Sequence, residues 1–578
     1  RLFGITQYSL SIYIKNFKCY QGTIFIPVFS GEPCKFVGYL GDNGVGKSAI
    51  LEALNTFFSN KPQWMRNKDA KVGPQNSFVA PVFIFDKNNI KQDLSKIQKN
   101  IIDDLGDTIF NPEQMLAVCV ARKEDNNSLV LFDGKKEFDG KDDLNLAEIL
   151  YEEISNLYQY VYIKSEVDID EEAKINSKIY EMIVESSIVD EVEKKFKESD
   201  EKNTLVDNLN DALQNLIDTK LIDRLKREDA QYAYVGTKGT PSKLSTNILA
   251  RISTEYFLNS KKLKYGGKEL ENLSSGQRRT VLLDFIAAVL ENKISSKSKT
   301  LLLAIDEPEI SLDTSKKMGQ FEKLARIAEG GTSVMFTSHW YGWIAALGIG
   351  RSILIEDIEA GKNIQKYENS LFPFRGIPKY EMRMIFDFLM SLGASAETNK
   401  YKKYIICEGP SDVTFLEASL KDDSCKIIPV GKGEVMKIAD IFKTYYWKDS
   451  GPVIKNVLFV IDTDPEHKNE YNNIYLKRWS KNATDVDFKF SLVSNSDNFH
   501  NKCTIENILE PDIYLEALKA NYPGDVLIQS LEIKHLDISG VDAYGMSLVD
   551  LRTFEKNTRA GKISLANKYK ELLLGSGK

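Results

Sequence analysis

The sequence has few of the residues from which disulfide frameworks and zinc sites are built. Six cysteines and four histidines are scattered along 578 residues, and no two cysteines form a CxxC pair. Such spacing excludes a disulfide-rich fold and a zinc-finger type of site, and it favours a reducing cytoplasm. The sequence shows no apolar run near the roughly 20 residues that a membrane helix needs, and no signal-peptide pattern at its start.

A basic excess is also missing, because the formal net charge is −7. A surface that binds nucleic acid must therefore be local. Hydrophobic residues make up 42 % and charged residues 28 %, which is typical of a soluble globular protein. At about 100–200 residues per domain, this length predicts roughly three or four units.

A glycine-rich loop lies between a short apolar strand at 35–40 and a helix at 48–58. It reads GDNGVGKS over residues 41–48, which matches the pattern G-x-x-x-x-G-K-[ST]. Backbone N–H groups of such a loop cradle phosphates, its lysine reaches the β- and γ-phosphates, and its hydroxyl binds Mg²⁺. The residues expected to contact ATP are Gly41, Asn43, Gly44, Gly46, Lys47 and Ser48.

A second motif is an apolar strand at 301–305 that ends in two carboxylates. Asp306 suits Mg²⁺ binding at the strand end, and Glu307 is placed to polarise the attacking water as a general base. Another strand, 334–337, precedes His339, which we expect to touch the γ-phosphate. A lone histidine is more often structural, and that alternative stays open.

The sequence LSSGQR at residues 273–278 predicts the start of a helix. Backbone N–H groups and a hydroxyl at a helix start can hold a γ-phosphate. We therefore expect Ser275, Gly276 and Gln277 to take part in nucleotide binding. Taken alone, Ser-Gly-Gln is also a simple helix-cap pattern.

A separate acidic site is predicted near the C-terminus. Glu408 and Gly409 follow an apolar strand at 404–407, Asp412 opens the next helix, and a strand at 457–461 ends in Asp462 and Asp464. Parallel strands bring their carboxyl ends to one edge of a sheet, so these carboxylates would converge. Clustered oxygen ligands favour Mg²⁺ or Mn²⁺, which can align phosphodiester cleavage.

These patterns divide the chain into an α/β ATPase and a second α/β domain. Residues 137–248 predict a mostly helical insertion, either a solvated arm or a dimerisation arm. The expected boundaries are 1–136 and 249–370 for the two ATPase lobes, 137–248 for the insertion, 371–400 for a connector and 401–578 for the C-terminal domain.

The motif set over residues 1–370 resembles the ABC/SMC/RecF-type P-loop ATPases, with Walker A, signature, Walker B, D-loop and H-switch in that order. The resemblance implies a homodimer in which Ser275 and Gly276 of one protomer face the ATP of the other. It also implies a Q-loop glutamine after Walker A. The candidates for that glutamine are Gln63, Gln75, Gln92 and Gln98.

The C-terminal acidic pair resembles the TOPRIM domain, and the whole layout resembles the OLD (overcoming lysogenisation defect) nucleases. On that resemblance Glu408 and Asp412 form the first acidic group, and Asp462 and Asp464 form the second. Glu506, in the sequence TIEN, would be a further metal ligand. Lys562 would stabilise charge in the transition state.

The expected function is therefore an ATP-regulated, metal-dependent endonuclease in the cytoplasm, acting on nucleic acid, with DNA favoured. The OLD resemblance suggests anti-phage defence with a helicase-like partner, or with a reverse transcriptase and its RNA–DNA product. An ATPase sensor or scaffold that binds nucleic acid without cutting it is the main alternative. A RecF-like clamp factor would not need the second acidic site, and a topoisomerase would need further modules.

Overall fold

A computed structural model describes most of the chain. The described residues are 7–30, 35–59, 61–71, 73–87, 93–105, 114–165, 209–212, 245–259, 264–269, 272–291, 300–358, 361–369, 374, 377–398, 401–420, 424–431, 433–448, 451–461, 476–480, 491–493, 505, 509–532 and 546–575. The candidate site residues Asp462, Asp464, Glu506 and Gln92 lie outside them. So does most of the predicted helical insertion.

The chain divides into two compact units, neither of which is one continuous stretch of sequence. The first unit is Arg1–Lys35, Ser48–Ser311 and Arg326–Phe336, and the second is Phe36–Lys47, Leu312–Ala325 and Thr337–Lys578. The boundary passes between Lys47 and Ser48, so residues 41–47 of the glycine-rich loop belong to the second unit, and Ser48 with the rest of the helix belongs to the first.

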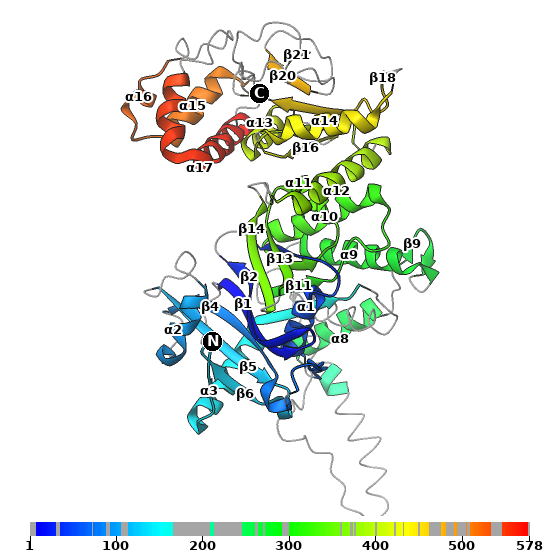
Figure 1. Ribbon diagram of the computed structural model, residues 1–578, viewed down its shortest axis with the longest axis vertical. Coiled ribbons are helices and arrows are strands. Elements are labelled where there is room, and N and C mark those ends of the chain that lie inside the picture. The colour runs from blue at the N-terminus through cyan, green and yellow to red at the C-terminus, as the bar shows by residue number, and fades with distance from the viewer. Residues whose placement is uncertain are drawn as a thin grey trace, which may run out of the picture. The chain divides into compact units, whose positions relative to one another are not determined.

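An antiparallel sheet of six strands dominates the N-terminal part of the first unit (Figure 1). Its order is β2-β1-β4-β5-β6-β7. The strands are β1 Gln7–Phe17, β2 Tyr20–Ser30, β4 Phe78–Asp86, β5 Met115–Lys123, β6 Leu129–Phe132 and β7 Glu137–Phe138. Nearly all of β4 and β5 is buried, as expected of central strands that are covered on both faces.

Two amphipathic helices, α2 (Ser95–Leu105) and α3 (Lys141–Leu157), pack on this sheet. Helix α2 buries apolar residues at spacing i, i+4 and i+8, and α3 does so at i, i+3 and i+7. The buried side chains are Ile97, Ile101 and Leu105 in α2 and Ala147, Leu150 and Ile154 in α3. Burying each Ile or Leu contributes about 1.5–3 kcal/mol, which fixes both helices on the sheet.

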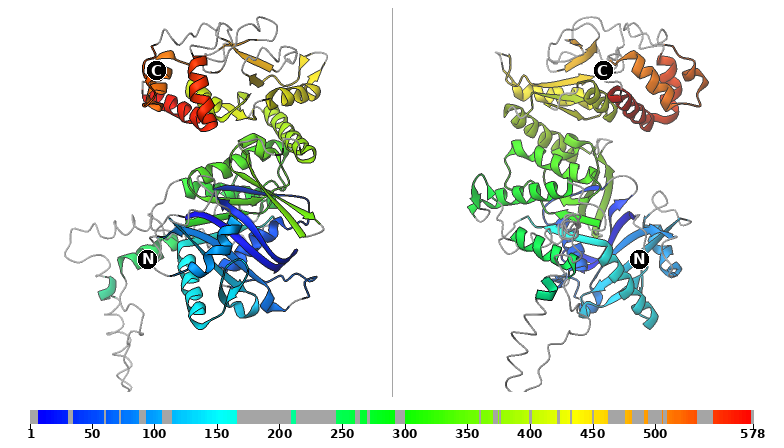
Figure 2. Two further views of the ribbon diagram at one scale, coloured as in Figure 1. Left: turned by 60° about the vertical axis from the view of Figure 1, so that its left-hand side comes forward. Right: turned by 180° about the vertical axis from the view of Figure 1, so that it is seen from behind.

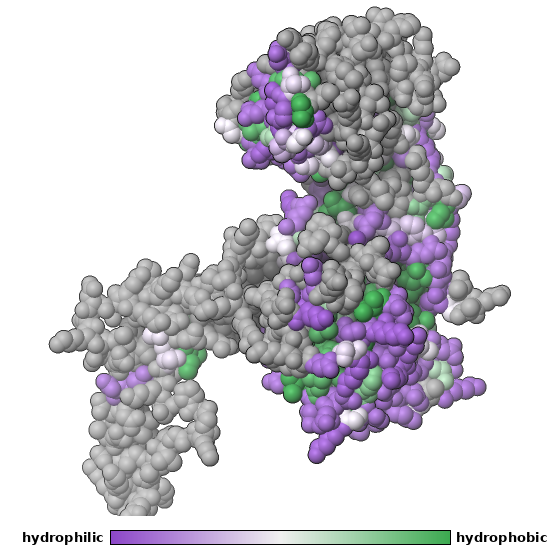
Figure 3. Space-filling model, turned by 90° about the vertical axis from the view of Figure 1, so that its left-hand side faces the viewer, coloured by the Kyte–Doolittle hydropathy of each residue, from purple (hydrophilic) through white to green (hydrophobic). Residues whose placement is uncertain are grey.

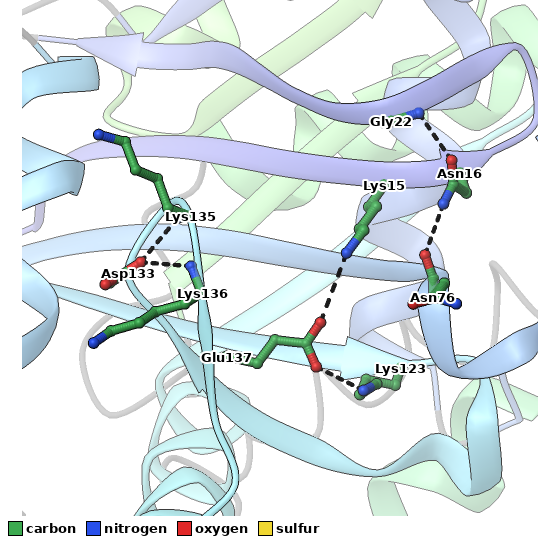
Figure 4. Close-up of polar contacts among 9 residues, drawn as sticks. All are labelled: Lys15, Asn16, Gly22, Asn76, Lys123, Asp133, Lys135, Lys136 and Glu137. Carbon is green, nitrogen blue, oxygen red and sulfur yellow. Dashed lines mark hydrogen bonds and ion pairs between the residues drawn. The ribbon is translucent and has the colours of Figure 1, made fainter. Parts of the chain in front are cut away.

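Polar contacts join the strands of this sheet at its surface (Figure 4). The carboxylate of Glu137 lies 2.6 Å from the ammonium group of Lys123 and 3.9 Å from that of Lys15. Asn16 accepts a hydrogen bond from the N–H of Gly22 and donates one to the carbonyl of Asn76, both at 2.8 Å. Glu137 of β7 thus links β5 and β1, and Asn16 links β1 to β2 and to the segment before β4.

A parallel set of strands forms the second part of this unit. Strand β11 (Thr300–Ile305) pairs in parallel with β12 (Ser333–Thr337) on one side and β8 (Tyr158–Ile163) on the other. The expected helical insertion from residue 137 therefore contains a strand of the ATPase sheet. The sequence YQYVYI, rich in aromatic and β-branched residues, explains that strand. Further elements among the described residues include α8 Thr246–Asn259, β9 Lys264–Tyr265, β10 Lys268–Glu269 and α9 Ser275–Glu291.

Helix α1 (Lys47–Phe58) is capped at its C-terminus by a buried arginine of β5. One guanidinium nitrogen of Arg122 donates to the carbonyl oxygens of Phe57 at 2.8 Å and Ser59 at 2.7 Å. It also donates to the hydroxyl of Tyr151 at 3.0 Å. A cation at a helix C-terminus satisfies carbonyls that lack helical partners and interacts favourably with the helix dipole.

In the second unit, β13 (Arg351–Ile358) pairs in parallel with β3 (Phe36–Leu40) and in antiparallel with β14 (Gly361–Glu368). Three helices complete this part: α10 Thr314–Glu329, α11 Gly342–Leu347 and α12 Pro378–Glu397. Residues 371–400 were expected to be a connector with one helix. That helix has 20 residues and many buried side chains, so it is an integral part of the fold.

The C-terminal part of this unit is a second α/β domain. Its sheet has the order β16-β15-β19-β20-β21, and only the last pair is antiparallel. Its elements are β15 Lys403–Cys407, α13 Pro410–Leu420, β16 Cys425–Pro429, α14 Glu434–Tyr446, β17 Trp447–Lys448, β18 Gly451–Pro452, β19 Val457–Ile461, β20 Leu476–Ser480, β21 Ser491–Val493, α15 Pro511–Asn521, α16 Val526–Gln529 and α17 Met546–Gly575. Helices α15 and α17, in orange and red in Figures 1 and 2, lie side by side.

A hydrophobic core holds these helices to the sheet. Phe415 of α13, Tyr514 of α15 and Tyr569 of α17 form an aromatic cluster, with ring centroids 5.6–6.3 Å apart. Edge-to-face pairs at such distances add stability beyond the area they bury. The strands and helices that the sequence predicts beside the ATPase motifs, and those it predicts before Glu408 and Asp462, are present in the structure.

The surface drawn in Figure 3 is mostly hydrophilic over the described residues, and its apolar patches are small. Large apolar side chains that stand exposed include Ile252, Tyr256, Met382 and Met390. Within the described residues, each helix is too short or too polar to cross a membrane.

Replacing Arg122 by Met should loosen the end of α1. The carbonyls of Phe57 and Ser59 would lose a buried donor, at a cost of about 1–3 kcal/mol. Amide hydrogen exchange in a peptide covering residues 47–59 should then be roughly 5- to 150-fold faster. Arg326→Met, at an exposed arginine of α10, is the control and should change that exchange little. Equal exchange in both variants would contradict the capping role.

Candidate functional site

The glycine-rich loop leaves a buried strand and closes against the backbone of β13. Strand β3 ends at Leu40, and Gly41 follows with φ +143°, a conformation that residues with a side chain rarely adopt. A Cβ atom at Gly41 would lie 2.3 Å from the carbonyl oxygen of Ile355. Another residue there would strain the backbone and clash, so the geometry requires glycine.

The lysine of this loop is folded back on the loop itself. Lys47 is 5 % exposed, and its ammonium group donates to the carbonyl oxygens of Gly41 at 3.0 Å and Asp42 at 2.9 Å. Asn43 and Gly44 are exposed at the tip of the loop. The buried ammonium group is thus held by backbone carbonyls at the N-terminus of α1 (Lys47–Phe58), and a helix N-terminus favours an anionic ligand such as a phosphate.

The hydroxyl of Ser48 and the carboxylate of Asp306 meet within the first unit. Ser48 Oγ donates to Asp306 Oδ1 at 2.7 Å, and Asp306 is only 6 % exposed. The backbone N–H of Asp306 donates to the carbonyl of Ile163 at the end of β8, 2.8 Å away. A hydroxyl and a carboxylate are oxygen ligands of the kind that Mg²⁺ takes beside nucleotide phosphates, so this pair fits the ion.

Glu307 follows in a sparsely populated backbone conformation, with φ +48°. Its carbonyl accepts the N–H of Ile310 at 3.0 Å, which closes a turn, and Ser311 also has a positive φ of +61°. Left-handed backbone at residues other than glycine costs of order 1–3 kcal/mol and is concentrated at functional sites. The partly exposed Glu307 side chain is compatible with the predicted role of general base.

The predicted signature begins helix α9 with a reciprocal capping box. Ser274 Oγ accepts the N–H of Gln277 at 3.3 Å, and the Gln277 side chain accepts the N–H of Ser274 at 3.2 Å. Gln277, predicted to contact nucleotide, therefore has a structural task in this chain. A Cβ atom on Gly276 would lie 3.0 Å from that of Ser311, so the glycine lets the signature approach the turn after Walker B.

Arg279, which the sequence analysis did not single out, joins α9 to Walker B. It is 3 % exposed, and its guanidinium donates to the backbone carbonyl of Asp306 and, at 2.9 Å, to that of Ser165. Burial lowers the pKa of Arg279, while the carboxylates of Glu309, Asp306 and Glu307 oppose that change. This buried arginine therefore fixes the backbone from which the Walker B carboxylates project.

The predicted H-switch follows the fully buried strand β12. His339 is partly exposed, and its backbone carbonyl accepts a hydrogen bond from Arg383 at 2.9 Å. Two residues on, the hydroxyl of Tyr341 accepts the N–H of Gly41 at 3.1 Å. Burial raises the pKa of Tyr341 to about 12. Within the second unit, the turn that contains His339 and Tyr341 therefore contacts the first glycine of Walker A.

The structure narrows the choice of Q-loop glutamine. The Gln98 side chain donates to the carbonyl of Ala117 at 2.7 Å and accepts its N–H at 2.8 Å. It therefore ties α2 to the edge of β5 and has a structural role. Gln63 and Gln75 are exposed, and both stay candidates.

A family model described as AAA ATPase domain, AAA_15, matches residues 10–340, which is more than half of the chain. The chain belongs to this AAA ATPase domain family. The predicted Walker A, signature, Walker B and H-switch residues all fall inside the matched range. The N-terminal part is thus an α/β P-loop ATPase domain that uses a nucleotide. The match ends before the C-terminal α/β domain.

Solved structures of SMC head domains show a distant likeness. The Smc head domain from Pyrococcus furiosus with an extended coiled coil, bound to the C-terminal domain of ScpA, is 13 % identical, with 63 % of this chain and 97 % of that chain covered and a TM-score of 0.31. The SMC head domain from Thermotoga maritima is 14 % identical, with coverage of 62 % and 98 % and a TM-score of 0.28. At such scores the family match alone carries the assignment. Among curated proteins none matches the chain.

Beyond the ATPase domain, two parallel strands end beside each other. Strands β15 and β19 pair with Tyr404 opposite Val457 and Ile406 opposite Phe459. Glu408 follows the end of β15, and β19 ends at Ile461, the residue before Asp462 in the sequence. Within the described residues, the structure gathers no three His, Cys, Asp or Glu side chains as a metal site.

Asp412 lies in the first turn of α13 and caps that turn. One of its carboxylate oxygens accepts the N–H groups of Gly409 at 3.1 Å and Glu408 at 3.2 Å. The residue therefore orders the turn that carries Glu408, whichever role its other oxygen has. Glu408 itself is partly buried.

Lys562 is partly buried in α17, the helix that packs on α13 and α15. Two other lysines of this helix already face carboxylates. Lys570 lies 2.8 Å from Glu417, and Lys568 lies 2.9 Å from Glu571. Exposed ion pairs of this kind contribute little stability, but they offset the positive charges of these two lysines.

Glu307→Gln should separate ATP binding from ATP hydrolysis. An amide of the same size keeps the turn but cannot take a proton from water, so kcat should fall by about 10²–10⁴-fold. Turnover would be measured by phosphate release, and binding with a fluorescent ATP analogue. Glu329→Gln, at an exposed glutamate of α10, should leave both unchanged. Full turnover in Glu307→Gln would rule out the general-base role.

Proposed function

We propose that this ATPase is also a metal-dependent endonuclease of the OLD type, in which the nucleotide state of the ATPase domain governs cutting by a TOPRIM-like C-terminal domain. The observation that supports it is the parallel pairing of β15 and β19, which end directly before Glu408 and Asp462. Carboxyl ends of adjacent parallel strands form the edge at which α/β sheets bind ligands.

The chemistry proposed for this edge is phosphodiester cleavage. Glu408, Asp462 and Asp464, with Glu506, would hold Mg²⁺ or Mn²⁺, and such ions activate water and stabilise the leaving oxygen. Lys562 would offset negative charge in the transition state. With Asp412 committed to capping its own turn, Glu408 is the stronger ligand of the first acidic pair.

The ATPase half of the proposal includes a homodimer. Each protomer would contribute Ser275 and Gly276 to the ATP of the other, and hydrolysis would involve Glu307 and His339. The proposed substrate is DNA. Anti-phage defence, with a helicase-like partner or a reverse transcriptase and its RNA–DNA product, is the proposed setting.

A second candidate function is an ATPase sensor whose C-terminal domain binds nucleic acid without cutting it. The capping role of Asp412 favours it, because that carboxylate has a structural reason to be present. A carboxylate that caps a helix turn needs no metal.

Glu408→Gln and Asp462→Asn should abolish cleavage of supercoiled plasmid in Mg²⁺ or Mn²⁺ while ATP turnover continues. Each removes one metal-binding charge without changing side-chain size, so a loss of about 100-fold or more is expected. Glu417→Gln, on the exposed side of α13, is the matched control and should cut normally. Lys47→Ala, which lacks the phosphate-binding lysine, reports whether nucleotide stimulates or restrains cutting.

Two outcomes would count against the nuclease. One is cleavage that survives in both acidic variants, which would point to a contaminating enzyme. The other is a wild-type protein that hydrolyses ATP yet leaves plasmid, single-stranded DNA and RNA intact with either metal. That result would favour the sensor.

A further inference from the structure

Within the second unit, Tyr341 joins its own turn to the Walker A loop and to helix α12. Its hydroxyl accepts the N–H of Gly41, the first glycine of Walker A, at 3.1 Å. Its ring stacks on that of Tyr380, with centroids 6.0 Å apart and planes 6° from parallel. The guanidinium of Arg383 lies 4.4 Å from its ring centroid. Both of those partners belong to α12.

Helix α12 also holds the backbone of the turn that contains His339. Arg383 donates to the carbonyl of His339 at 2.9 Å, and Asp387, one helical turn further on, accepts the N–H of Tyr341 at 2.8 Å. The indole N–H of Trp340 donates to the backbone carbonyl of Asp387 at 3.1 Å. All three residues of the turn are therefore bound to α12.

The turn that contains His339 and helix α12 are closely packed against each other. A Cβ atom on Gly342, directly after the turn, would lie 2.7 Å from the backbone nitrogen of Phe388 in α12. At the start of the same helix, Lys379 pairs with Asp42 of the Walker A loop at 2.9 Å. Both charges of that pair are exposed, so its contribution to stability is small.

The other side and the far end of α12 contact the C-terminal α/β domain. Glu381 pairs with Lys437 of α14. A Cβ atom on Gly393 would overlap the ring of Tyr446, the last residue of α14, so the two helices touch there. Asn456, next to β19, donates to the carbonyl of Ala396 at 3.1 Å near the end of α12.

We propose that Arg383 and Asp387 are positioning residues for the turn at His339, and that α12 thereby couples the nucleotide state of the ATPase domain to the C-terminal domain. The proposal rests on the H-switch role given to His339 above, and it is independent of nuclease activity. A helix of 20 residues is about 30 Å long and stiff. A shift of the turn that contains His339 must therefore displace α12 or break its contacts.

Arg383→Gln and Tyr341→Phe test the two ends of the junction. Gln keeps a helix-forming side chain but loses the charge over the ring, and Phe keeps the stacked ring but loses the contact to Gly41. Met382→Gln, one residue away on an exposed position of α12, is the control. ATP turnover and amide hydrogen exchange of α14 (434–446), with and without Mg·AMP-PNP, would be measured in full-length protein.

In wild type and Met382→Gln, the nucleotide should change exchange in α14 by about 5-fold or more, the lower range of allosteric coupling. Both junction variants should lose that difference. Their kcat should fall about 10-fold with KM within about 2-fold, which separates positioning from nucleotide binding. An unfolded variant would show fast exchange without nucleotide as well.

The coupling is overturned if wild-type α14 exchanges equally with and without nucleotide, or if both variants keep the wild-type difference. His339→Ala distinguishes this failure from that of the proposed H-switch. Unchanged turnover in His339→Ala would remove the role of His339 in hydrolysis, while the exchange comparison would still decide whether α12 transmits the nucleotide state.

Discussion

The hydrogen bond from Ser48 to Asp306 is the contact on which the nucleotide site depends. It joins the first turn of α1 to the end of β11, across 258 residues of sequence. Asp306 is buried, and a buried carboxylate needs partners because removing a charge from water is costly. Its side chain receives the serine hydroxyl and its backbone N–H bonds to β8. Arg279 then holds its carbonyl from the signature helix. Walker A, signature and Walker B are thus linked through a single residue.

The ATPase motifs could be recognised in the sequence because the local backbone geometry requires particular residue types. Gly41 must be glycine because its φ is positive and its backbone passes close to the carbonyl of Ile355. The strands around the motifs are apolar runs that end in polar residues, which also makes them visible in the sequence. For this reason the ATPase fold and the strands before Glu408 and Asp462 could be predicted.

Other features could not be predicted from the sequence, because they depend on contacts between segments that are far apart in it. In the sequence, Arg279 cannot be distinguished from an arginine on the exposed face of a helix. Its burial and its contact with the carbonyl of Asp306 are seen only in the structure. The sequence does not show whether Gln277 caps α9 or contacts nucleotide. The cap is seen only in the structure, from the hydrogen bond between the N–H of Ser274 and the side chain of Gln277. Strand β8 was missed since charged helical sequence surrounds it. The roles of Tyr341 and Arg383 depend on where α12 packs.

The capping role of Asp412 also bears on whether a cation can sit beside Glu408. Helix α13 begins two residues after Glu408, and a helix N-terminus carries partial positive charge that opposes a nearby cation. The Asp412 carboxylate accepts two N–H groups of that turn and so neutralises part of this charge. Asp412 would therefore favour a metal at Glu408 even without touching it. Capping and metal binding are in this way compatible: the structural role of Asp412 favours the sensor, and it does not exclude a nuclease.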